Sequence, residues 1–273
     1  MGTHVFKKRF DKSVVKILGV YNIKGGVGKT ATAVNIAHLA AQSGLRTLIW
    51  DLDPQAAATF YLRVKPKVKR SEKMLSGKKF DLNEVVKGSD YPNLDLLPAD
   101  FSYRNMDLLL GENKKPALRL LKLLRPLAEE YEAVVLDCPP SISLVSENIF
   151  RAADALLLPT IPTTLSLRTM QQLLDFMEGH KLSTPVYAFY SMVDRRKRMH
   201  LDVMASGQDP RCCVLETAIP YATEVERMGI ERRAVTDYAP RSPAGRAYQA
   251  LWEEIQAKVG GLRPLPMTYD SPF

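Results

Sequence analysis

Short apolar runs alternate with longer amphipathic segments along most of this chain. Six short runs, the first of them rich in β-branched residues, are typical of buried parallel strands. They are 14–21, 46–54, 93–99, 132–140, 154–160 and 185–194. The longer segments carry apolar residues at helical spacing, and they are 31–44, 116–131, 164–180 and 242–259. Strands that alternate with helices predict an α/β fold with a doubly wound, mainly parallel sheet flanked by helices.

These elements describe one domain. The chain has 273 residues, of which 46% are hydrophobic, and this is enough for a single core of that class. No internal repeat and no linker divides it. We expect a single domain over residues 14–260, a flexible N-terminal extension over 1–13 and a C-terminal tail over 261–273. No run approaches the roughly 18 consecutive apolar residues of a membrane span.

A glycine-rich loop, NIKGGVGKT (22–30), lies between the first predicted strand and the first predicted helix. Consecutive backbone N–H groups in such a loop form an anion cradle, and the helix adds its positive dipole end. Lys29 would reach the β- and γ-phosphates of a nucleotide, and the Thr30 hydroxyl would bind Mg²⁺. The ordinary motif has a glycine at the place of Ile23, and a second lysine, Lys24, lies inside the loop. The expected phosphate-binding residues are Gly25, Gly26, Val27, Gly28, Lys29, Thr30 and Ala31.

Acidic residues end two further strands at the same edge of the predicted sheet, where ligands of doubly wound folds bind. Asp137 ends the apolar strand VVLD, the place of a carboxylate that holds Mg²⁺ in P-loop proteins. Asp51 and Asp53 end the neighbouring strand, and both can face one site because alternate strand residues share a face. One of them could orient the attacking water. For Asp53, which precedes Pro54, helix capping is a competing interpretation.

The three motifs together resemble the deviant-Walker ATPases of the ParA/MinD group. They are NIKGGVGKT, DLDPQ (51–55) and VVLDCPPS (134–141), and the later blocks 161–174 and 218–251 resemble ParA-type partition ATPases. The resemblance implies a P-loop ATPase domain in which Lys24 reaches across a dimer interface to the phosphates of the other subunit. It also implies that Asp53 positions the hydrolytic water and belongs to the Mg²⁺ site together with Thr30 and Asp137. ATP and Mg²⁺ are the expected cofactors, with Met192 and Pro220 beside the adenine base.

Other members of this fold class fit the sequence less well. The residues after the last helix contain prolines and are not amphipathic, which speaks against a MinD-type membrane anchor. Cys138, Cys212 and Cys213 lack the spacing of nitrogenase-type iron proteins, and they suit a reducing cytoplasm. The stretch 191–194 lacks the Asn-Lys pair with which GTPases recognise guanine. The motif DLDPQ and the C-terminal block speak against ATP-dependent amido-ligases.

The positive charge of the chain is compatible with a polyanionic partner. The formal net charge is +8, and the family resemblance implies non-specific DNA binding by the ATP dimer. Arg211 aligns with one arginine that the family commonly uses for DNA binding. At another such position this chain has Glu224. Clusters at 63–79 and 195–198 add further basic residues, and the first of them has no assigned role. The candidate DNA-binding residues are Arg211, Arg227, Arg232 and Arg233.

The sequence thus predicts a cytoplasmic, nucleoid-associated ATPase that dimerises on ATP, binds DNA non-specifically and positions or segregates a cargo. A ParB-like or cargo-adaptor protein is expected to stimulate its slow hydrolysis. The alternatives are a nucleotide-dependent dimerisation switch that recruits a protein partner without DNA, and a MinD-like positioning protein.

Overall fold

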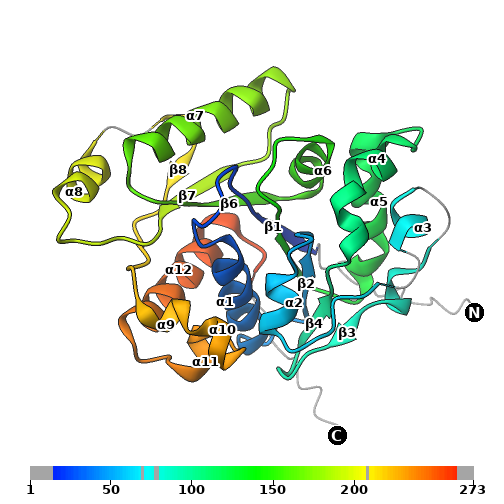
Figure 1. Cartoon of the computed structure of the whole chain (residues 1–273), viewed down its shortest axis with the longest axis horizontal. Coiled ribbons are helices and arrows are strands. Elements are labelled where there is room, and N and C mark those ends of the chain that lie inside the picture. The colour runs from blue at the N-terminus through cyan, green and yellow to red at the C-terminus, as the bar shows by residue number, and fades with distance from the viewer. Residues whose placement is uncertain (1–14, 69–70, 77–79, 207–208, 263–273) are drawn as a thin grey trace, which may run out of the picture.

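A computed structural model describes residues 15–68, 71–76, 80–206 and 209–262. These residues form an eight-stranded sheet in the order β3-β4-β2-β5-β1-β6-β7-β8 (Figure 1). All neighbouring strands are parallel except β3, which runs antiparallel to β4. The strands are β1 (Lys16–Val20), β2 (Thr47–Asp51), β3 (Lys87–Gly88), β4 (Leu94–Leu97), β5 (Ala133–Asp137), β6 (Ala155–Thr160), β7 (Val186–Tyr190) and β8 (Cys213–Val214). The predicted doubly wound fold is therefore confirmed.

Helices cover both faces of the sheet (Figure 1). The α-helices are α1 (Lys29–Gln42), α2 (Ala57–Tyr61), α3 (Ser71–Leu75), α4 (Met106–Gly111), α5 (Arg119–Leu124), α6 (Leu144–Ala152), α7 (Thr164–Gly179), α8 (Arg198–Ala205), α9 (Thr223–Glu226), α10 (Met228–Glu231), α11 (Val235–Tyr238) and α12 (Pro243–Val259). Four 3₁₀ turns add η1 (Leu82–Glu84), η2 (Phe101–Asn105), η3 (Pro116–Leu118) and η4 (Arg125–Glu129). No helix among the described residues is long and apolar enough to cross a membrane.

Alternate residues of the central strands pack into two separate hydrophobic cores, one on each face of the sheet. Leu18 and Val20 of β1 pack with α1 and α12, whereas Ile17 packs with the opposite core that contains α4 to α7. The same alternation occurs in β5, where Val135 and Val134 lie in different cores. The period of two along a strand explains this division. It also explains why the parallel strands are apolar on both sides.

The segment 116–131 differs from the single helix that its spacing predicts. It consists of η3, α5 and η4, and the α-helix ends at Leu124, two residues before Pro126. Proline lacks a backbone N–H and clashes with the preceding turn, so the regular helix cannot continue through it. The terminal extension 1–13 and nearly all of the tail 261–273 lie outside the described residues, so their expected roles stay predictions.

The C-terminal helix α12 approaches the preceding backbone closely at Gly245. A Cβ atom at this position would lie 2.3 Å from the Ala239 carbonyl oxygen. Overpacking against backbone costs about 1–3 kcal/mol, so we expect Gly245→Ala to lower the free energy of unfolding by that amount. The matched control is Gly179→Ala in α7, where an added Cβ meets nothing within 4 Å. Equal unfolding curves for both variants in urea would contradict this packing.

Candidate nucleotide-binding site

The glycine loop connects β1 to α1 and adopts a conformation that needs glycine at two places. Gly26 and Gly28 have φ angles of 70° and 91°, in the left-handed region. A Cβ on Gly28 would also come within 3.0 Å of the Ser191 hydroxyl. Asn22 fixes the start of the loop, because its side chain donates to the Pro159 carbonyl and accepts from the Lys24 N–H. The first turn of α1 has no side-chain cap and no acidic residue, which leaves its N–H groups for an anion.

Lys29 is held inside this loop. Its side chain is buried, and its Nζ donates to the Lys24 carbonyl oxygen at 2.8 Å. Burial lowers the pKa of Lys29, while the charge of Asp137 opposes that shift. The ammonium group is thus already desolvated and positioned at the mouth of the anion cradle. Val27, which was expected to bind phosphate with its neighbours, has a buried side chain, so only its backbone can take part.

Lys24 points in a different direction from Lys29. Its Nζ lies 3.5 Å from the hydroxyl of Ser166, near the N-terminus of α7. It is not among the residues that line the pocket beside the glycine loop. The two lysines of the loop therefore have different neighbours: the Lys29 ammonium lies inside the loop, and the Lys24 ammonium lies beside α7.

Two buried aspartates face each other at the carboxyl ends of β2 and β5. Asp51 and Asp137 are paired in the strand register, and both are fully buried. Asp51 is satisfied locally, because its carboxylate accepts hydrogen bonds from the Thr59 N–H and hydroxyl and from the Asp53 N–H. Burial still raises its pKa to about 6. These bonds use its oxygens for structure, which leaves Asp53 as the acid available to a ligand.

Asp137 has no such compensation. Neither of its carboxylate oxygens makes a hydrogen bond in the described part of the chain. Burial, followed by the charge of Asp51, raises its pKa well above the ordinary value, and the nearby Thr30 hydroxyl and Lys29 oppose the shift. A buried carboxylate without a partner takes up a proton or a cation. No cluster of three or more His, Cys, Asp or Glu side chains that could hold a metal occurs within the described residues, so Mg²⁺ here would be held by Asp137, Thr30, phosphate and water, as Mg²⁺ prefers.

A pocket of about 420 Å³ opens beside the glycine loop. Asp53 lines it, and its carboxylate accepts a hydrogen bond from the Gln55 N–H at 2.9 Å. Met192 and Pro220, expected near the base, also lie in its wall, because Val193 and Pro220 pair in a parallel bridge. Several other residues line the pocket without belonging to any sequence motif. These are Tyr61, Ser191, Tyr221, Val225, Glu226 and Tyr248.

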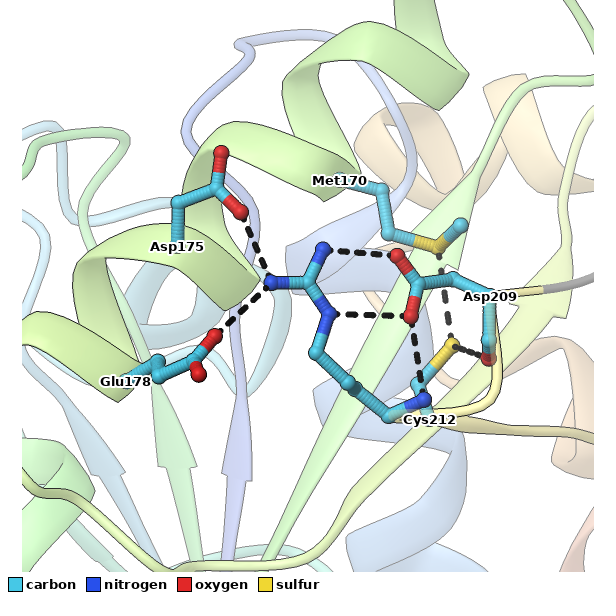
Figure 2. A network of polar contacts seen from close by, with 6 residues as sticks. Met170, Asp175, Glu178, Asp209 and Cys212 are labelled. Atoms are coloured by element: carbon cyan, nitrogen blue, oxygen red, sulfur yellow. Dashed lines mark hydrogen bonds and ion pairs between the residues drawn. The ribbon is translucent and has the colours of Figure 1, made fainter.

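The four candidate DNA-binding arginines do not form one surface. Arg211 contacts three carboxylates, as Figure 2 shows, and these belong to Asp175, Glu178 and Asp209. It lies beside α7, whereas the other three lie around α10 on the opposite face of the sheet (Figure 1). Arg227 pairs with Glu231 and Arg233 with Asp237, while Arg232 donates to the Phe60 carbonyl. Lys69, Arg70, Lys78 and Lys79 of the basic stretch 63–79 lie outside the described residues.

The glycine cradle, the buried lysine, the hydroxyl at the start of α1 and the unpaired acid at the end of β5 define a P-loop nucleotide-binding protein. A family model described as an AAA domain matches residues 15–184. The sporulation initiation inhibitor protein Soj of Bacillus subtilis is 29% identical over 250 residues, which cover 89% of this chain and 98% of that protein. The chromosome partitioning protein ParA of Caulobacter vibrioides is 29% identical over 254 residues, with 88% and 94% covered. The chain belongs to the ParA/MinD-type P-loop ATPase family.

Solved structures agree with this assignment at the level of the fold. Cobyrinic acid a,c-diamide synthase of Mycobacterium smegmatis, with a bound ATP analog and magnesium, superposes with a TM-score of 0.77 at 26% identity, covering 93% of this chain and all of that one. The septum site-determining protein MinD of Pyrococcus horikoshii, complexed with Mg-ADP, gives a TM-score of 0.72 at 19% identity, covering 92% of this chain and 100% of the other.

Asp137 gives the site a measurable pH dependence in the absence of metal. Because folding raises its pKa, the folded state holds the proton more tightly, and stability falls as the pH rises from the ordinary carboxyl pKa through the raised value. Asp137→Asn removes this loss. We expect the variant, free of nucleotide and in EDTA, to be more stable than the parent at pH 7 by about 1 kcal/mol or more. The difference should shrink toward pH 4 in thermal unfolding.

The same variant tests the metal assignment. Mg²⁺ together with ADP should raise the unfolding temperature of the parent more than ADP alone, and Asp137→Asn should lose that increment. Glu112→Gln, an exposed carboxylate on the surface, is the control and should behave as the parent. A variant that is less stable without ligand and keeps the full Mg²⁺ increment would refute the role of Asp137.

Proposed function

We propose that this protein is a ParA-type ATPase that binds ATP and Mg²⁺, forms an ATP-sandwich dimer and positions or segregates a cargo. The observation that carries the proposal is the placement of its two loop lysines. Lys29 occupies the cradle, while Lys24 extends away from the pocket of its own chain toward Ser166. A second lysine in this position can neutralise phosphates bound to another copy. Two facing triphosphates repel each other, and one lysine from each chain offsets that repulsion.

Each residue of the site has a proposed part in hydrolysis. The loop N–H groups and Lys29 orient the β- and γ-phosphates, and bound Mg²⁺ would neutralise charge on them. Thr30 and Asp137 would hold that metal. Asp53 is the acid that faces the pocket with its carboxylate only partly used by the Gln55 N–H. It would therefore orient the attacking water, whereas Asp51 shapes the loop. Turnover would be slow until a ParB-like or cargo-adaptor protein completes the site.

DNA binding by the dimer is part of this proposal, and the net charge of +8 supports it. Arg227, Arg232 and Arg233 lie close together in sequence on one face. The exposed side chains of Arg195 and Lys197, just before α8, make no ion pair with any described residue and are further cations available to DNA. Arg211 would have to give up its carboxylate partners to contact phosphate. Nucleoid association in the cytoplasm would follow from such binding.

A second candidate function has specific support. Three of the four expected DNA-binding arginines already pair with carboxylates of the same chain, and a further position at which the family commonly has an arginine holds Glu224. Those pairings favour a dimerisation switch that recruits a protein partner without DNA. The two candidates share the nucleotide site and differ only in what the ATP dimer binds.

The role of Lys24 leads to a first test. Lys24→Ala should still bind ATP, because Lys29 and the loop backbone remain, but should lose ATP-dependent dimers in sedimentation. Turnover should fall by about tenfold or more, since a transition-state charge contact is lost. Lys122→Ala, an exposed lysine on α5, is the control. Unchanged dimerisation and turnover in Lys24→Ala would remove the main support for the proposal.

DNA binding leads to a second test. The Asp53→Ala variant should dimerise on ATP without turning it over, so that the dimer persists during the measurement. We expect it to bind random-sequence duplex DNA with ATP but not with ADP, and the affinity should fall steeply with salt, by a slope of about −0.9 per phosphate contact. Stable ATP dimers that fail to bind duplex at any salt concentration would favour the dimerisation switch instead.

A further inference from the structure

A second polar pocket lies behind α2, on the far side of Tyr61 from the nucleotide site. Its volume is about 280 Å³, and it lies where the end of α2 packs against α10. Three of its lining residues are arginines, namely Arg63, Arg232 and Arg233. Tyr61 lines this pocket and the nucleotide pocket alike. The sequence marked Arg232 and Arg233 as candidate DNA contacts, but it gave no sign that they share a pocket with Arg63, and the proposed ATPase chemistry does not use this pocket.

Two of these arginines hold an unfavourable backbone conformation. Arg63 and Arg232 have φ angles of 60° and 50°, in the left-handed region that non-glycine residues rarely adopt. Such a conformation persists only where the surroundings enforce it, and it is concentrated at functional sites. Here two arginines at one pocket adopt the left-handed backbone conformation, in which a glycine or an asparagine would be less strained.

Reciprocal hydrogen bonds hold the two arginines in place. Arg63 donates from Nη2 to the Glu231 carbonyl at 3.2 Å, and Arg232 donates from Nε to the Phe60 carbonyl at 2.9 Å. The guanidinium of Arg232 also lies 4.4 Å from the centroid of the Phe60 ring. We call this pair of residues, Arg63 and Arg232, the arginine clamp. It joins the end of α2 to the end of α10 and keeps both cations at the pocket.

The charges around the pocket do not balance. Three guanidinium groups face two carboxylates, Asp90 and Asp237. Asp90 is a weak partner, since it lies 3.5 Å from Arg63 and its side chain is 68% exposed. Asp237 is occupied by Arg233 and by the Tyr91 hydroxyl. The terminal nitrogens of Arg232 have no acceptor among the described residues, so the pocket has spare donors and a net positive charge.

We propose that the arginine-clamp pocket is a second anion site, which takes one phosphate group between Arg63, Arg232 and Arg233. Guanidinium groups match phosphate oxygens through paired N–H donors, and a volume of about 280 Å³ leaves room for such a group. The phosphate can belong to a DNA backbone or to a small free phosphoanion. The inference rests on the pocket itself and holds whether or not the proposed ATPase function does.

The first experiment measures binding of inorganic phosphate to the full chain by calorimetry. Saturating ADP and Mg²⁺ occupy the glycine loop, so that phosphate reports on other sites. Arg232→Gln and Arg233→Gln should each weaken phosphate binding about tenfold. Arg46→Gln is the matched control for Arg233→Gln, because each of these arginines is partly exposed and pairs with one carboxylate. It should match the parent within about twofold.

Two outcomes would overturn the site. The first is that the parent binds no phosphate in the presence of ADP. The second is that Arg46→Gln weakens phosphate binding as much as the pocket variants do. Arg233 lies outside the arginine clamp, so Arg233→Gln remains informative if Arg232→Gln folds poorly, and ADP affinity reports on the fold of each variant. If ADP itself fails to bind, the proposed ATPase function fails, and phosphate binding to the Lys29→Ala protein then tests the pocket alone.

The second experiment identifies the source of the phosphate. Inorganic phosphate should compete with a 20-base-pair random duplex for the ATP-bound Asp53→Ala protein if the backbone occupies the pocket, and Arg232→Gln should weaken duplex binding. Unchanged duplex binding together with lost phosphate binding in that variant assigns the pocket to a free phosphoanion. Both results support the anion site. Duplex and phosphate binding that are each unaffected by Arg232→Gln and Arg233→Gln would refute it.

Discussion

Two aspartates facing each other at the ends of adjacent strands set the electrostatics of this molecule. Asp51 and Asp137 are paired in the register of β2 and β5, and neither reaches solvent. Two buried negative charges at this spacing cannot both remain ionised without compensation. Hydrogen bonds from Thr59 stabilise the Asp51 carboxylate. The Asp137 carboxylate has only the nearby Lys29 and Thr30, and it remains available to a bound cation. The glycine loop, the buried lysine and the open pocket are all arranged around that incomplete compensation.

The sequence reveals most of the fold and the phosphate half of the site, because both depend on local signals. Strand periodicity, the glycine loop and the acids at strand ends are contiguous motifs. Asp51 and Asp53 look equivalent in sequence, and the structure separates them through Thr59, eight residues away, whose hydroxyl no motif marks. Pro126 explains why α5 ends at Leu124. The start of α5 depends on a tertiary contact, because the Arg119 and Leu120 N–H groups donate to the side-chain oxygen of Asn148.

The base half of the site and the cationic surface depend on contacts between distant segments. Met192 and Pro220 meet because residues 190–193 and 219–221 run side by side, and resemblance to relatives was the sole guide to them. The arginines were grouped by their spacing, yet the doubly wound topology places Arg211 and Arg232 on opposite faces. Charge counted along a chain does not distinguish a solvated cation from one already neutralised by carboxylates.

Arg211, which lies outside α7, neutralises two carboxylates near the C-terminal end of that helix. Asp175 and Glu178 lie in its last turns, where the negative end of the helix dipole disfavours acids and where α7 supplies no basic residue of its own. The same helix begins beside Ser166, the neighbour of Lys24. A helix of 16 residues is about 24 Å long. One helix therefore contacts the glycine loop through Ser166 at its N-terminal end and is neutralised by Arg211 at its C-terminal end, so a single element joins the nucleotide loop to the Arg211 cluster.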